Sequence, residues 1–124
     1  GWTWRGTTVP PLTHMKGISD RATGKAPYQL PQSFVEARGK FDGDTVFDFV
    51  TTNDIVGGNS GSPAVNARGE IIGAVFDGNI HSLGGAYFYD GALNRAIVVS
   101  TCAVSVALDK IYDNQALLTE LRQN

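Results

Sequence analysis

Polar and apolar residues alternate along residues 45–51, which predicts a β-strand with one buried face. Two more segments of β type follow, residues 63–66 and 71–77, with a turn at residues 67–70 between them. Two such runs joined by a short turn containing glycine predict a β-hairpin. The middle of the chain is therefore expected to be built from strands.

The apolar pattern continues as strands and then changes to helical spacing. Residues 86–89 and the apolar run within residues 94–100 each predict a further strand. From Thr101 the apolar residues recur at helical spacing, which predicts a helix capped by Ser100 or Thr101. Asn114 is expected to end this helix and to cap a second one with apolar positions at Leu117, Leu118 and Leu121.

The first part of the chain has little periodicity. Residues 1–30 contain three prolines, Pro10, Pro11 and Pro27. The pair Pro10-Pro11 excludes a helix at residues 10–11. Ser33 and Glu36 match a capping box, which predicts a short helix starting at Phe34. We therefore expect three segments in one domain: a loop-rich lead-in, a β-barrel portion and a helical end, over residues 1–44, 45–100 and 101–124.

Composition excludes several classes of protein. The chain has 124 residues, 42% hydrophobic and 18% charged, with a net charge of −2, so a globular fold is expected and nucleic acid is not an expected partner. No apolar run approaches the roughly 18 residues of a membrane span, and no signal peptide is expected at Gly1. With Cys102 as the one cysteine, no disulfide forms within the chain, and we expect this thiol to be buried and inert. Two histidines with one cysteine are too few to predict a zinc site, and we expect no cofactor.

The stretch with the clearest chemistry is the glycine-rich loop at residues 57–63, Gly-Gly-Asn-Ser-Gly-Ser-Pro. Glycines let the backbone adopt positive φ and turn several N–H groups into one concavity. A serine hydroxyl beside such a concavity is the arrangement that acyl transfer needs. The alternative is a hairpin loop with exposed serines, which is common in β-proteins.

This loop resembles the serine loop of trypsin-like peptidases. The resemblance implies that Ser60 is the nucleophile and that the N–H groups of Gly58 and Ser60 stabilise the oxyanion. The loop is not the nucleophile elbow of α/β-hydrolases, because Ser62 replaces its last glycine and both flanks are predicted strands.

A wider set of motifs resembles the bacterial serine dipeptidyl-peptidases of the dipeptidyl-peptidase 7 and 11 family. These motifs lie at residues 52–55, 57–63, 66–73, 76–79, 94–97 and 108–110. The resemblance implies the second barrel of a chymotrypsin-like double β-barrel followed by a C-terminal helix. It also implies release of dipeptides from a free N-terminus, in the periplasm or at the surface of Gram-negative bacteria, by a longer and usually dimeric protein.

The same resemblance implies an incomplete active site. The family's catalytic histidine and aspartate belong to an N-terminal part that this sequence lacks, so the rest of the peptidase chain is an expected partner. Neither His14 nor His81 lies in a motif that the family associates with its histidine. Because a serine without a base is a poor nucleophile near neutral pH, we expect this chain alone to be inactive.

Three further positions bear on substrate specificity. The resemblance implies that Asp77 binds the substrate's α-ammonium group, although a turn-forming aspartate before Gly78 is an equal alternative. It implies that Gly78 leaves the specificity pocket uncharged, for a hydrophobic residue before the cut. Asp54 precedes Ser60 by six residues, the spacing of the aspartate that binds Lys or Arg in trypsins. We interpret it as structural or as pocket wall, because the dipeptidyl-peptidases carry Thr-Asn-Asp here.

Other functions compete with this interpretation. A glutamyl-type endopeptidase can share the serine loop, but it would carry a histidine where this chain has Val75. A trypsin-like endopeptidase would use Asp54, and a non-catalytic trypsin-like module would bind peptides without cleaving them. In a plain β-barrel scaffold the glycine loop would be only a turn.

Overall fold

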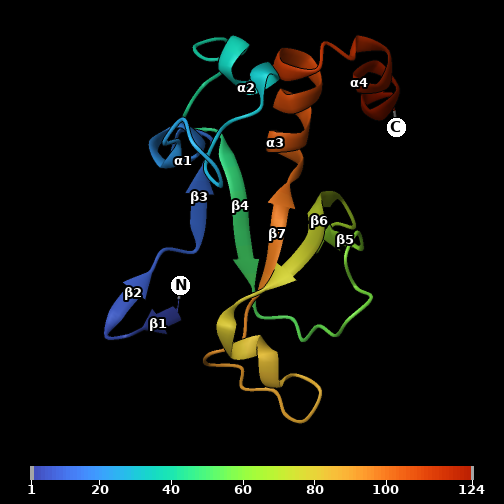
Figure 1. Ribbon diagram of the computed structural model, residues 1–124. Helices are drawn as coiled ribbons and strands as arrows, with labels where there is room; N and C mark the ends of the chain where they lie inside the picture. Colours follow the sequence, from blue (N-terminus) through green and yellow to red (C-terminus); the bar gives the residue numbers. More distant parts are fainter. Residues whose placement is uncertain (1, 124) are drawn as a thin grey trace. The chain divides into compact units, whose positions relative to one another are not determined.

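The structure is a computed structural model that describes residues 2–123. The chain forms two compact units. Figure 1 labels their helices and strands. The first comprises the chain up to Thr13 together with Phe47–Thr101, and the second comprises His14–Val46 together with the chain from Cys102.

The main element of the fold is a five-stranded sheet with strand order β3-β4-β7-β6-β5. Its strands are β3 (Leu12–His14), β4 (Val46–Thr51), β5 (Pro63–Val65), β6 (Ile71–Gly78) and β7 (Ala96–Ser100). A separate pair is formed by β1 (Trp2–Trp4) and β2 (Thr7–Val9). The predicted strands at residues 45–51, 63–66, 71–77 and within 94–100 are thus confirmed, as is a mainly β fold with helices.

The core of the first unit is organised on the central strand β7. Ala96, Val98 and Ser100 are buried and alternate with partly exposed residues, as expected for a strand with one face on a core. β7 pairs antiparallel with β4 on one side and with β6 on the other. This strand therefore connects the hairpin to the rest of the sheet.

The hairpin of β5 and β6 is held by the side chain of Asn66. Its Oδ1 accepts the N–H groups of Arg68 at 2.9 Å and of Glu70 at 3.1 Å, and Gly69 takes a φ of +79° in the same turn. Arg68 and Asn66 also donate to the Glu70 carboxylate, which lowers the pKa of Glu70. The turn is thus specified by one amide side chain and one glycine.

Replacing Asn66 with alanine is expected to loosen this hairpin in the full-length protein. The loss of two hydrogen bonds to backbone N–H groups should destabilise the hairpin by about 1–2 kcal/mol. Local amide exchange should then be about 5- to 30-fold faster across β5 and β6, measured by hydrogen–deuterium exchange and mass spectrometry. Arg68→Ala, which removes only an exposed ion pair, should leave the exchange unchanged. Equal effects of both variants would contradict the role given to Asn66.

The pairing of β6 with β7 has an irregularity at Phe76. Val75 lies opposite Val98, but Asp77 lies opposite Ile97, so β6 has one extra residue at this point. Such bulges bend a strand and change the direction of the side chains that follow, and they are frequent beside active sites. Here the residues after the irregularity are Asp77 and Gly78.

Two sequence predictions for the first unit are wrong. Residues 86–89, predicted to be a strand, form the end of a turn and irregular chain after a short 3₁₀-helix, η1 (Ile80–Gly84), and they are exposed. High β-propensity does not produce a strand where no partner strand supplies the hydrogen bonds. The lead-in is not simply loops with one helix, because β1, β2 and β3 lie within it.

The second unit is helical. It contains α1 (Lys16–Arg21), α2 (Gln32–Glu36), most of α3 (Thr101–Val106), a π-helical turn η2 (Ala107–Ile111) and α4 (Gln115–Arg122). α2 and α4 both contact η2. The buried apolar residues of this unit are Met15, Ala37, Ala103 and Leu118.

The helix ends agree only in part with the prediction. Asn114 caps α4 as predicted, with its side chain accepting the N–H of Leu117 at 3.2 Å. The predicted capping box at Ser33 is wrong, because α2 begins at Gln32 after Pro31 and has no side-chain cap. Cys102 is exposed on α3, not buried. No helix within residues 2–123 is long and apolar enough to cross a bilayer.

Candidate active site

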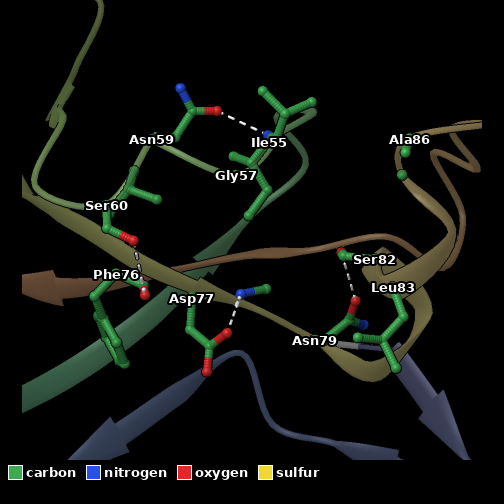
Figure 2. Close-up of a pocket in the computed structure, with 14 residues that line it drawn as sticks. Ile55, Gly57, Asn59, Ser60, Phe76, Asp77, Asn79, Ser82, Leu83 and Ala86 are labelled. Atoms are coloured by element: carbon green, nitrogen blue, oxygen red, sulfur yellow. Dashed lines mark hydrogen bonds between the residues drawn. The ribbon is translucent and has the colours of Figure 1, made fainter.

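A pocket of about 420 Å³ lies in the first unit (Figure 2). Three segments line it, within residues 55–60, 75–79 and 82–86. They are the glycine-rich loop, the end of β6 on both sides of the irregularity, and η1 with the residues that follow it. The pocket therefore brings the predicted serine loop together with Asp77 and Gly78.

The glycine-rich loop is closed by the side chain of Asn59. Its Oδ1 accepts the N–H of Val56 at 2.8 Å, and its own N–H is donated to the Val56 carbonyl at 3.2 Å. Gly58 and Gly61 have φ values of +101° and +89°, a region that residues with a side chain rarely adopt. The two glycines and the asparagine thus fix the path of the backbone on both sides of Ser60.

Among the described residues, the hydrogen bonds of this loop leave the N–H groups of Gly57, Gly58 and Ser60 free. The N–H groups of Gly61 and Ser62 are donated to backbone carbonyls at 2.7 and 2.9 Å. Within the described part of the chain, the N–H groups of Gly58 and Ser60 have no hydrogen-bond partner. The free N–H of a serine, together with that of the residue two positions before it, can bind an anionic oxygen.

Ser60 has an exposed and weakly held hydroxyl. Its Oγ donates to the carbonyl of Phe76 over 3.5 Å, which is long for a hydrogen bond from a hydroxyl (Figure 2). The hydroxyl is therefore available for another partner at the mouth of the pocket.

Neither histidine lines the pocket. The ring of His81 contacts the ring of Trp4 edge to face, with centroids 5.8 Å apart. The buried Nε2 of His81 has no hydrogen-bond partner among the described residues, so it does not accept the proton of Ser60. His14 lies in β3.

Asp77 is the one charged residue among those that line the pocket. It is exposed, and its Oδ1 accepts the N–H of Gly78 at 2.8 Å, which orients the carboxylate. Asp54 is exposed and does not line the pocket. Among residues 2–123, no three His, Cys, Asp or Glu side chains are grouped as a metal site would require.

The wall opposite the serine loop includes residues that the sequence did not single out. Leu83 and Ser82 of η1 line the pocket, as does Ile55 before the loop. η1 follows Asn79, which is 4% exposed and donates its side-chain amide to the carbonyl of Leu93 at 2.8 Å. The sequence did contain a sign of this turn. Asn79 directly follows a strand and lies three residues before Ser82, a spacing at which the two side chains can hydrogen-bond.

Comparison with known proteins identifies the family. The Peptidase S46 model matches residues 1–123, so the chain belongs to the Peptidase S46 family. Among its relatives is dipeptidyl-peptidase 7 of Phocaeicola vulgatus, 48% identical over 118 residues, which are 88% of this chain and 16% of that protein. Another is the Asp/Glu-specific dipeptidyl-peptidase of Porphyromonas gingivalis, 42% identical over 73 residues, or 59% of this chain and 10% of that one.

A solved structure has the same fold. The crystal structure of Porphyromonas endodontalis DPP11 in complex with the dipeptide Arg-Asp matches with a TM-score of 0.84 and 26% identity. The match covers 96% of this chain and 18% of that chain. This chain thus spans less than a fifth of the length of these relatives, and the family predicted from the sequence motifs is confirmed.

Proposed function

We propose that this chain is part of a serine dipeptidyl-peptidase and carries its nucleophile, its oxyanion donors and one wall of its substrate pocket. One observation supports this most directly. The N–H groups of Gly58 and Ser60 are free beside an exposed serine hydroxyl that lines a pocket. In this proposal Ser60 Oγ attacks the scissile carbonyl, and the two N–H groups bind the oxygen that becomes negative.

The base and its orienting acid come from other parts of the full-length protein. Neither histidine of this chain lines the pocket, and the relatives named dipeptidyl-peptidases are several times longer. We therefore expect this chain alone to be inactive. The proposal includes a chymotrypsin-like double barrel to which this sheet belongs, a homodimer, and a location in the periplasm or at the cell surface.

Substrate selection follows from the charges of the pocket. Asp77 is exposed and oriented, so it can pair with the free α-ammonium group of a peptide and set the cut two residues away. Among residues 2–123, no lysine, arginine or histidine lines the pocket, so this wall offers no cationic partner to a carboxylate side chain. Ile55, Leu83 and the open position at Gly78 instead favour a hydrophobic residue before the cut.

An assay of dipeptide release by the full-length protein tests this proposal. Coumarin substrates with Leu or Phe, Asp or Glu, and Lys or Arg before the cut are offered with free and with blocked N-termini. We expect release from free, hydrophobic substrates. Asp77→Asn, which keeps the acceptor for Gly78, should lower kcat/KM for free substrates about 10- to 100-fold by losing one charge-assisted hydrogen bond.

The matched control is Asp54→Asn, an exposed aspartate away from the pocket, which should change neither rate nor preference. Cleavage of blocked substrates would favour an endopeptidase, and a preference for Lys or Arg that is lost in Asp54→Asn would favour the trypsin-like alternative. Binding of peptides without cleavage would favour a non-catalytic module.

A further inference from the structure

We propose that Ser82, supported by Ile55, keeps position 78 free of a side chain and thereby fixes the class of residue that the pocket accepts. On this view a change of specificity at position 78 requires a simultaneous change at position 82. The inference rests on the proposed function for its meaning, but its structural part can be tested separately.

The space around Gly78 is too small for a side chain. A Cβ added at this glycine would lie 2.9 Å from the Cβ of Ser82 and 3.2 Å from the Cδ1 of Ile55. Contacts between Cβ atoms at 2.9 Å essentially never occur, and neither atom can rotate away, since each is fixed by its backbone. Any residue other than glycine therefore requires the wall itself to shift.

The wall around Ser82 is held in place by several hydrogen bonds. Its Oγ donates to Asn79 Oδ1 at 3.0 Å (Figure 2). The same Oγ lies 3.3 Å from the carbonyl of Arg95, and the Ser82 N–H is donated to the Asn79 carbonyl at 2.9 Å. Asn79 is in turn buried and accepts the N–H of Arg95 at 3.1 Å. Moving Ser82 would break bonds that connect η1 to the residues just before β7.

Specificity follows from this packing. This wall has no cation among residues 2–123 to pair with a carboxylate side chain, and because Gly78 lines the pocket, an arginine at position 78 would supply one. The contact with Ser82 opposes that substitution as long as a Cβ is present at position 82. Glycine at position 82 would remove the obstructing atom.

Thermal unfolding of the full-length protein tests the packing through paired variants. Gly78→Ala should lower Tm by about 3 °C or more, as overpacking does. The double variant Gly78→Ala with Ser82→Gly should have the same Tm as Ser82→Gly alone. Combining Gly78→Ala with Ser82→Ala, which keeps the Cβ but loses the hydroxyl and its contacts, should give less relief than Ser82→Gly. Gly57→Ala is the matched control for stability, because a Cβ at this pocket-lining glycine would meet nothing within 4 Å.

Kinetics of the same protein test the specificity. Gly78→Arg alone should lose activity on hydrophobic substrates without gaining Asp or Glu substrates. The double variant with Ser82→Gly should raise the ratio of kcat/KM for Glu over Leu at least about 100-fold above the wild type. The inference is overturned if Gly78→Ala leaves Tm unchanged, if Ser82→Ala relieves it as well as Ser82→Gly, or if Gly78→Arg alone acquires the acidic preference. A wild type that releases no dipeptide would refute the proposed function, while the Tm comparison would still decide the packing.

Discussion

Ser60→Ala in the full-length protein is expected to lower kcat/KM for dipeptide release by on the order of 10⁴-fold or more. The variant lacks the oxygen that would form the acyl-enzyme. Its stability should not change, because the exposed hydroxyl makes only a 3.5 Å contact with the carbonyl of Phe76. Dipeptidyl-coumarin release and a thermal melt measure the two quantities.

Ser62→Ala is the control for this experiment. Ser62 is two residues away in the same loop, and its carbonyl accepts the N–H of Val75 at 2.9 Å whatever its side chain. We expect the activity of the Ser62→Ala variant to remain within about fivefold of that of the wild type. Mass spectrometry after treatment with a fluorophosphonate should also place the label on Ser60. A Ser60→Ala protein that remains active would contradict the serine mechanism.

Gly58→Ala is expected to lower kcat by about 10²- to 10³-fold with little change in KM. Nothing lies within 4 Å of the added Cβ, so the effect comes from the backbone, whose φ of +101° is unfavourable for alanine. Relaxation of this strain would turn the N–H groups of Gly58 and Ser60 away from the oxyanion. Losing one such donor costs about this much in other enzymes.

Gly69→Ala separates strain from catalysis. Gly69 has a φ of +79° in the hairpin turn, also has nothing within 4 Å of an added Cβ, and does not line the pocket. The Gly69→Ala variant should lose about 1 kcal/mol of stability but keep the kcat of the wild type. If both variants reduce kcat equally, Gly58 has no special role in the site.

Strands with a partner close in sequence were predictable from the pattern alone. The hairpin of β5 and β6 combines alternating residues with a turn marked by Asn66 and Gly69. Asn114 likewise identified the start of α4, because its side chain can satisfy a free N–H group there. In both places the signal and the interaction lie within a few residues of each other.

The pattern failed where distant contacts decide the structure. Residues 86–89 have a sequence typical of a strand, but no strand pairs with them in the described part of the chain. β3 is only three residues long and depends on β4, more than thirty residues later. The π-helical turn η2 had no sequence signal that we could identify.

The candidate site divides in the same way. Ser60, Asp77 and Gly78 were identified from motifs, and the structure gathers them around one pocket, while their roles stay predictions. Ser82 and Leu83 were missed because their importance comes from the position of η1. That position depends on two hydrogen bonds of the Asn79 side chain, which donates to the carbonyl of Leu93 and accepts the N–H of Arg95, fourteen and sixteen positions later.

The extra residue at Phe76 has a consequence for how this strand can change in evolution. In a regular strand, successive side chains point to opposite faces of the sheet along its whole length. A change of pairing register that improves one end therefore turns the side chains of the other end to the opposite face. In β6 this alternation is reset at Phe76, between Val75, which lies opposite Val98 of the core strand, and Asp77, which lies at the pocket. A change of register in the half of β6 that ends at Val75 therefore need not be carried into the half that starts at Asp77, although both residues line the pocket.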